Sequence, residues 1–251
     1  MARNVVYTAI FDNYDRLRPI KFHTAHCDFV CFTTCDKRKK YQGWTLIPFS
    51  DDRFDAVMRN RFLKIHPHVV LGQYEKSLYI DGNIELLQDP SRLLDTILLQ
   101  ERIAAPQHRM KNCAYEEGEY CIKINKAPQK DVLDQLAYYE AAGFPRNWGL
   151  TENNLLMRRH NDPAVIKLMD CWWEQLQRWS KRDQICFPFC QWQTGITVKA
   201  IALDIRLPNR YFRWWQHDTK AIGIIKRQYR ILKKRITWRL YRFREKNCSI
   251  L

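Results

Sequence analysis

Short apolar runs typical of buried strands alternate along this chain with longer segments in which apolar residues recur every three or four positions. The earliest run, Asn4–Ile10, leads into the polar turn Phe11–Asp15. Closely spaced strands followed by alternating strands and helices predict an α/β domain with a mixed central sheet flanked by helices. The expected strands are Asn4–Ile10, Asp28–Thr33, Trp44–Pro48, Lys76–Ile80, Ile84–Leu87, Arg102–Ala105 and Asn153–Arg159. The expected helices run from a cap at Asp51 and Asp52 to about His66, begin at Pro90, and cover Asp131–Ala142, Pro163–Trp179 and Gln184–Thr194.

Size and charge divide the chain into a body and a tail. A length of 251 residues with 46% hydrophobic residues suffices for one large domain without disulfide staples. Eleven Lys or Arg and a single Glu lie between Thr219 and Asn247, so this segment carries +10 of the formal net charge of +15. We therefore predict a single domain over residues 1–218 and a basic, amphipathic helical tail over residues 219–251.

The tail repeats apolar residues at steps of three and four from Ile222 to Phe243, which draws one apolar stripe along a helix. Together with its cations, this stripe predicts a helix that lies on an anionic membrane surface. The same pattern fits a helix that packs its stripe against the domain while the cations are solvated.

The cysteine pattern bears on the compartment. Nine irregularly spaced cysteines, in a chain whose first residues lead directly into a strand, favour reduced thiols in a cytosol. Cys27, Cys31 and Cys35 lack the Cys-x-x-Cys turn of a structural zinc site, so buried free thiols are the preferred interpretation. No apolar run approaches the ~18–20 residues that a membrane-spanning helix needs. We expect a cytoplasmic protein that is peripheral at the inner face of the membrane.

The sharpest local signal is the strand Lys76–Ile80, which stops abruptly at Asp81, Gly82 and Asn83. Ligands of open α/β sheets bind at the carboxyl ends of strands, and two oxygen donors there suit a hard divalent cation. Gly82 favours a tight turn. The alternative is a plain hairpin turn that joins Ile80 to Ile84.

Cations precede this strand on the expected helix, where Arg59 and Lys64 are candidates for binding a diphosphate. A solvated basic face is the alternative.

Further along, Arg109 lies close to Glu116 and Glu117, which could supply a general base or could form the first turn of a surface helix. Asp183 is expected to cap the helix that follows it. No dinucleotide-binding glycine motif, Walker-type loop or nucleophile elbow occurs.

Several segments together resemble the glycosyltransferase-like family that includes the plant mucilage-related proteins and many bacterial members. The similar stretches are Tyr7–Asp15, Asp28–Thr33, Arg59–His68, Leu78–Leu86, His108–Glu117, Gly149–Asn161 and Arg182–Phe187. The layout also looks like that of the glycogenin-like and lipopolysaccharide galactosyltransferase families. The resemblance therefore implies a GT-A-like domain that binds a nucleotide sugar.

Carried over by position, the resemblance implies a metal site at Asp81 and His217, with Asn83 where those families have Asp. This neutral ligand predicts weak binding of Mn²⁺ or Mg²⁺. The resemblance also implies that Lys220 contacts the diphosphate and that Asp183 and Gln184 lie near the donor sugar or acceptor. Asp12, in the turn after the first strand, joins Arg59, Lys64 and Arg109 as a predicted substrate-binding residue.

The function predicted is transfer of a sugar from a nucleoside diphosphate sugar to a hydroxyl of a glycan or glycolipid, as in polysaccharide biosynthesis. Positioning and charge stabilisation on the departing diphosphate would supply most of the catalysis. The alternative is a catalytically inactive α/β protein whose basic tail binds an anionic membrane or nucleic acid. For the glycosyltransferase the expected partners are the nucleotide sugar, the acceptor and an anionic membrane surface, without nucleic acid.

Overall fold

The computed structural model describes residues 4–34 and 39–217. The strands are β1 (Asn4–Ile10), β2 (Cys27–Thr33), β3 (Lys40–Tyr41), β4 (Trp44–Pro48), β5 (Lys76–Ile80), β6 (Ile84–Leu86), β7 (Ile103–Pro106), β8 (Leu155–Arg158), β9 (Lys199–Ile201) and β10 (Phe212–Trp214). The helices are α1 (Ala56–Ile65), α2 (Pro67–Val70), α3 (Ser91–Ile97), α4 (Ala114–Lys123), α5 (Gln129–Ala141), α6 (Pro163–Arg178) and α7 (Asp183–Thr194). The predicted tail, residues 219–251, and its Lys220 lie outside the described residues.

The described strands form an eight-stranded sheet in the order β3-β4-β2-β1-β5-β8-β7-β9, and β6 pairs separately with β10. Strands β4, β2, β1 and β5 run parallel, whereas β8 is antiparallel to both β5 and β7. Every residue of β1 is buried, as expected for a central parallel strand covered on both faces. The mixed sheet predicted from the sequence is therefore confirmed.

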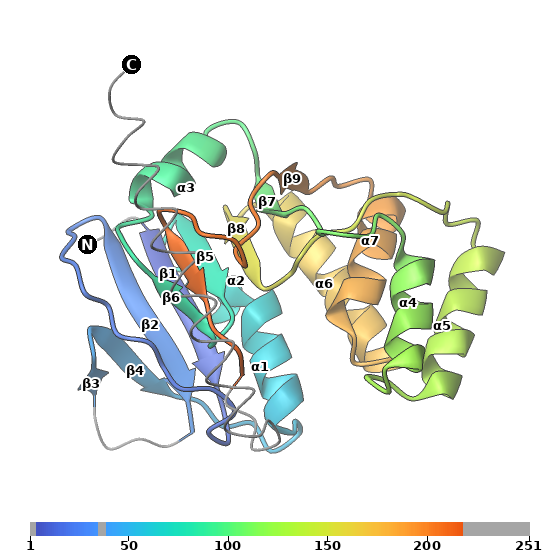
Figure 1. Ribbon diagram of the computed structural model, residues 1–251, viewed down its shortest axis with the longest axis horizontal. Helices are drawn as coiled ribbons and strands as arrows, with labels where there is room; N and C mark the ends of the chain where they lie inside the picture. The colour runs from blue at the N-terminus through green and yellow to red at the C-terminus, as the bar shows by residue number, and fades with distance from the viewer. Residues whose placement is uncertain (1–3, 35–38, 218–251) are drawn as a thin grey trace.

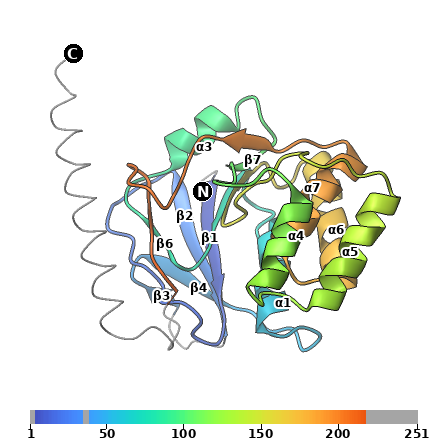
Figure 2. The ribbon, with the colours of Figure 1, turned by 45° about the vertical axis from the view of Figure 1, so that its right-hand side comes forward.

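Two apolar cores cover the two faces of the sheet. On one face, Tyr7 and Tyr79 pack with buried side chains of α1 and α4–α7. On the other face, Val6 and Leu78 pack with α3, β6 and β10. Figures 1 and 2 show α4–α7 gathered as a helical group beside the sheet, with α3 separate from it. This alternation along β1 and β5 follows the two-residue period of a strand.

Two helix starts differ from the sequence prediction. Helix α1 is capped by Asp55, whose side chain accepts a hydrogen bond from the Met58 backbone N–H at 2.8 Å, rather than by Asp51 or Asp52. Helix α7 has Arg182 at its N-cap position, and Asp183 is its first residue. Asp183 does not cap the helix because buried cations hold its carboxylate, as described below.

Helix α4 and the cysteines bear on two of the alternatives. Glu116 and Glu117 lie in the first turn of α4, as the surface-helix alternative expects, although Glu117 is buried. Cys27 and Cys31 are buried free thiols, as predicted, whereas Cys35 lies outside the described residues. Among residues 4–34 and 39–217, no helix is both long and apolar enough to cross a bilayer.

Candidate functional site

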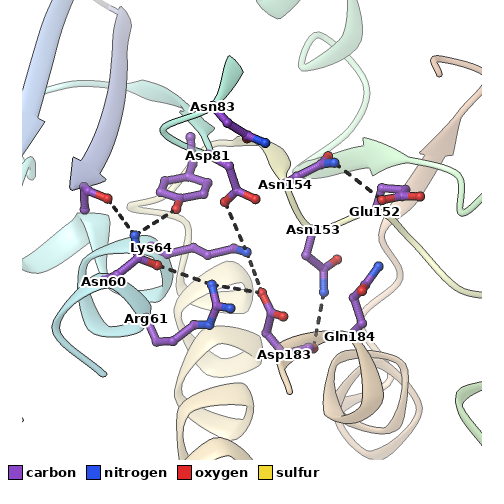
Figure 3. A network of polar contacts seen from close by, with 12 residues as sticks. Asn60, Arg61, Lys64, Asp81, Asn83, Glu152, Asn153, Asn154, Asp183 and Gln184 are labelled. Atoms are coloured by element: carbon purple, nitrogen blue, oxygen red, sulfur yellow. Dashed lines mark hydrogen bonds and ion pairs between the residues drawn. The ribbon is translucent and has the colours of Figure 1, made fainter. Parts of the chain in front are cut away.

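The site is built at the carboxyl end of β5. The strand is buried from Ser77 to Ile80, and the chain leaves it at Asp81. The Asp81 backbone N–H donates to the Asn154 carbonyl at 2.9 Å, and the Asp81 carbonyl accepts from the Ile84 N–H at 2.9 Å. These two bonds hold a tight turn whose Asp81 side chain points toward a network of polar groups (Figure 3).

Gly82 is required in this turn for space. Its φ angle is not in the left-handed region, but a Cβ added to it would lie 2.8 Å from Ile10 Cγ1 and 3.1 Å from Asp15 Cβ. The turn is not a hairpin, because β5 belongs to the large sheet and β6 pairs with β10. The hairpin alternative is thus excluded, and Asp81 lies at the carboxyl end of a strand of the open sheet.

Behind Asp81 lies a buried cluster of charges. Lys64 Nζ is 2.5 Å from Asp183 Oδ2 and 4.0 Å from Asp81 Oδ1, and Arg61 Nη1 is 3.5 Å from the same Asp183 oxygen (Figure 3). We refer to Arg61, Lys64 and Asp183 as the inner cluster. It joins α1 to α7 directly beneath the end of β5.

Electrostatics keep the inner cluster charged. Burial alone would raise the pKa of Asp183, but the charges of Arg61 and Lys64 hold it well below its usual value. Burial opposes the charge of Arg61, yet Asp183 and Asp81 raise the pKa of this guanidinium above its ordinary value. Burial lowers the pKa of Lys64, and the same two carboxylates oppose that shift. The carboxylate of Asp183 is therefore ionised and already neutralised by its partners.

Neighbouring polar groups fix the inner cluster in place. Asn60 donates to the Ala9 carbonyl at 2.7 Å and accepts from Arg61 Nη1 at 3.3 Å. The Asp183 carbonyl accepts hydrogen bonds from Trp172 Nε1 at 3.0 Å and from Asn153 Nδ2 at 3.3 Å. These bonds tie α1, α6, α7 and the approach to β8 into one rigid support.

The outer side of the site contains Asp81, Asn83, Asp15 and His217, which we call the outer cluster. His217 Nδ1 lies 2.9 Å and 3.2 Å from the two carboxylate oxygens of Asp15. Asn83 donates through Nδ2 to the Trp215 carbonyl at 2.8 Å, and the same nitrogen is 3.5 Å from His217 Nε2. Residues separated by more than 130 positions are therefore brought together.

Three predicted metal ligands fit a divalent cation by their chemistry. The amide hydrogens of Asn83 face Trp215, which leaves its carbonyl oxygen available as a ligand. Because His217 Nδ1 contacts Asp15, Nε2 is the nitrogen that could ligate a cation, and a ligated cation would replace its 3.5 Å contact with Asn83 Nδ2. Within the described part of the chain, no three His, Cys, Asp or Glu side chains are grouped to hold a metal. A site here would thus combine two such groups, Asp81 and His217, with one neutral amide.

Several polar residues of the site were not predicted from the sequence. Glu152, Asn153 and Asn154 precede β8 and lie near Asp81 and Gln184 (Figure 3). Arg206 holds Glu152 through two contacts of 2.7 Å and 3.0 Å. A signal for this run exists, since three polar residues directly before an apolar strand mark the edge of a sheet. Asp15 has no such local signal.

The structure places the other predicted site residues outside this network. Asp12 is exposed after β1 and has a positive φ of 53°. Arg59 points instead to Asp51, whose carbonyl accepts from its Nε at 3.1 Å. Arg109 pairs with Asp204 at 3.6 Å, and Glu117 is buried against Lys111 at 2.6 Å, while Glu116 is exposed on α4. Their assignments to substrate binding and catalysis stay predictions.

Comparison with known proteins gives matches over most of the chain. The model of the TOD1/MUCI70 glycosyltransferase-like domain matches residues 1–205. The probable hexosyltransferase MUCI70 of Arabidopsis thaliana is 24% identical over 215 residues, which cover 73% of this chain and 36% of the relative. The alkaline ceramidase TOD1 of Arabidopsis thaliana is 21% identical over a match of 253 residues, and the match covers 87% of this chain and 54% of the relative. The chain thus spans about a third to a half of the length of these relatives.

Among solved structures, mouse xyloside xylosyltransferase 1 matches with a TM-score of 0.43 and 10% identity, over 82% of this chain and 86% of that protein. Family membership rests on the sequence match, and the predicted α/β architecture rests on the sheet and helices described above. Because residues 1–205 match its model, the chain belongs to the TOD1/MUCI70 family of glycosyltransferase-like domains.

Proposed function

We propose that this domain transfers a sugar from a nucleoside diphosphate sugar to a hydroxyl group of a glycan or glycolipid. The observation that carries the proposal is the placement of Asp81 at the end of β5, with Lys64 Nζ 4.0 Å behind it. A partly exposed carboxylate backed by buried cations gives a fixed field at a sheet edge. Charge that develops on a departing diphosphate would be stabilised by such a preorganised site.

Each part of the site has a separate role in this proposal. Asp81, Asn83 and His217 would hold Mn²⁺ or Mg²⁺, and such an ion supplies neutralisation of diphosphate charge when it is bound. Lys64 and Arg61 would add positive charge close to this proposed cation. Gln184, whose Nε2 donates to the Thr151 carbonyl at 3.4 Å, has its amide oxygen available for a sugar hydroxyl. The role of Asp183 is to keep the two cations oriented.

The relatives leave the donor, the acceptor and the reaction open to test. One of the two is described as a hexosyltransferase and the other as a ceramidase, which cleaves an amide bond. Transfer of a hexose is the reaction we propose, because the inner and outer clusters provide charge for a phosphate leaving group.

The test is hydrolysis and transfer with the full-length protein. A panel of UDP-, GDP- and ADP-linked hexoses with Mn²⁺ is expected to give slow donor hydrolysis with at least one member. Asp131→Asn, at an exposed position on α5, serves as a charge-matched control for substitutions at the site. Release of fatty acid from ceramide, with no hydrolysis or binding of any nucleotide sugar, would overturn the proposal.

We also propose that the basic segment over residues 219–251 holds the domain at the anionic inner face of a membrane. The support is its sequence, which combines a charge of +10 with one apolar stripe. Flotation with anionic and neutral liposomes tests this. Binding that is independent of lipid charge and of salt concentration would contradict it.

A further inference from the structure

Asp15 makes a close, two-point contact with the imidazole of His217. Its two carboxylate oxygens lie 2.9 Å and 3.2 Å from Nδ1, although the residues are 202 positions apart in the sequence. The Asp15 carboxylate is 8% exposed, whereas the imidazole is 38% exposed. The aromatic ring of Tyr14 also packs on His217, with centroids 5.1 Å apart. The ring is therefore held from behind while its other edge faces the site.

This contact determines which nitrogen of His217 is available. A carboxylate can only accept a hydrogen bond, so Nδ1 must carry a proton. In the neutral ring the lone pair then resides on Nε2, which lies 3.5 Å from Asn83 Nδ2. Asn83 in turn is fixed by mutual backbone and side-chain bonds to Trp215, both at 2.8 Å.

The local backbone is shaped to bring Asp15 to this position. Asp12 and Asn13 have φ angles of 53°, which is uncommon for residues other than glycine, and they tighten the turn after β1. Gly82 leaves room for Asp15, because a Cβ on Gly82 would lie 3.1 Å from Asp15 Cβ. Asp15 therefore follows a tight turn and lies against Gly82.

We propose that Asp15 is a positioning residue that holds His217 with Nε2 ready to ligate a divalent cation beside Asp81. The inference rests on the proposed function, which places a cation at Asp81, Asn83 and His217. Carboxylates that orient metal-binding imidazoles typically contribute 10–100-fold to metal affinity. Asp15 would act through His217 without touching the substrate.

The tautomer is tested first, without metal or substrate. Two-dimensional ¹H–¹⁵N spectra of the imidazoles of full-length protein are recorded at about pH 9, where a histidine ring is neutral. His217, identified by the loss of its signals in His217→Ala, is expected as the Nδ1–H tautomer. Asp15→Ala is expected to remove that preference. Finding the Nε2–H tautomer in the wild type would overturn the proposal.

Affinity for Mn²⁺ is measured next by electron paramagnetic resonance. Asp15→Ala is expected to weaken Mn²⁺ binding by about 10–100-fold, and His217→Ala by at least as much. Asp95→Ala is the matched control, because Asp95 also pairs with a cation, Lys76, and lies on α3 away from the site. The affinity of the Asp95→Ala variant for Mn²⁺ is expected to equal that of the wild type.

The outcomes separate this inference from the proposed function. Weaker binding in His217→Ala but not in Asp15→Ala would overturn the role of Asp15 and leave the glycosyltransferase proposal standing. Unchanged binding in both variants would overturn the role of His217 as a ligand, and with it that of Asp15, whereas hydrolysis of a nucleotide sugar would still support the function. The expected Mn²⁺ and tautomer results without any reaction of nucleotide sugars would support Asp15 and contradict the proposed function.

Discussion

The inner and outer clusters both contain aspartates, but these carboxylates differ in what they face. In the inner cluster, Lys64 and Asp183 are 2% and 7% exposed and contact each other at 2.5 Å. In the outer cluster, Asp81 is 29% exposed, and its closest cation, Lys64, is 4.0 Å away. The inner charges are satisfied by protein, whereas Asp81 retains oxygen atoms that can bind a ligand.

This difference separates residues that stabilise the fold from residues that are available for the reaction. A buried ion pair is strongly destabilised when one partner is removed, because the other charge is left without compensation. A partly exposed carboxylate is hydrated when it has no ligand, so its loss affects the reaction more than the fold. We therefore expect substitutions in the inner cluster to act on stability and those in the outer cluster to act on activity.

Among the single substitutions, the largest effect on stability is expected for Asp183→Ala. It leaves the buried Lys64 and the partly buried Arg61 without the carboxylate that lies 2.5 Å and 3.5 Å from them. The free energy of unfolding should fall by about 3–5 kcal/mol, as measured by urea denaturation. The matched control is Asp134→Ala, which removes an exposed pair with Lys130 and should change stability by less than about 0.5 kcal/mol. Equal stability of the two variants would contradict the structural role of Asp183.

The next effect is the loss of activity in Asp81→Asn. The variant keeps the size of the side chain but removes the charge that faces the proposed metal and diphosphate. Turnover of the nucleotide sugar should fall by about 10²–10³-fold, while the unfolding temperature stays near that of the wild type. Asp131→Asn should retain full activity. Near-normal turnover of Asp81→Asn at limiting Mn²⁺ would show that the outer cluster is not the reaction centre.

The inner and outer clusters were also not equally predictable from the sequence. Asp81 follows from a local pattern, because a strand that stops at an acid places this acid at the carboxyl end of the sheet. Lys64 was predicted to bind a diphosphate, whereas the structure buries it against Asp183. Asn83 was proposed from the same strand end, and the role of His217 as a ligand followed from the resemblance. Asp15 was missed because its partner, His217, is 202 positions away in the sequence.

Asp183 illustrates why a local pattern can mislead. An acid at the start of a helix predicts an N-cap, which is worth about 1 kcal/mol. The structure instead gives Asp183 two cations from α1, and an ionic contact at this depth outweighs a backbone cap. Similarly, the identity of Glu117 does not reveal that its carboxylate turns inward to Lys111. Both outcomes depend on tertiary contacts that no short segment encodes.

A third prediction concerns the effect of acid on two buried histidines, His66 and His160. Burial lowers the pKa values of His66 and His160 from 6.5 to about 4, and the nearby charge of Arg158 contributes to both shifts. The unfolded chain therefore binds more protons between pH 6.5 and pH 4, and stability must fall as the pH drops through this range. Asp183 loses its charge only at lower pH, because its folded pKa is depressed.

We expect acidification from pH 6.5 to pH 4 to reduce the free energy of unfolding by several kcal/mol, to which each of the two imidazoles contributes up to about 3 kcal/mol. Urea denaturation at each pH measures this loss. His160→Gln should show a shallower decrease over the range, since one titrating group is absent. Stability that is constant down to pH 4 would contradict the burial of these imidazoles in neutral form.

The smallest effect is expected for Asn83→Asp, which tests how the outer cluster balances charge against packing. A second carboxylate beside Asp81 should tighten Mn²⁺ binding by about tenfold, because carboxylates are stronger ligands than amides for a hard cation. Asn83 also donates to the Trp215 carbonyl at 2.8 Å, and an ionised aspartate cannot replace that bond. Without metal the variant should therefore lose about 1 kcal/mol of stability, and saturating Mn²⁺ should restore it. Asn153→Asp, which places the new charge near Asp183, is the control and should not gain Mn²⁺ affinity. Weaker Mn²⁺ binding by Asn83→Asp than by the wild type would mean that this side chain serves only to anchor Trp215.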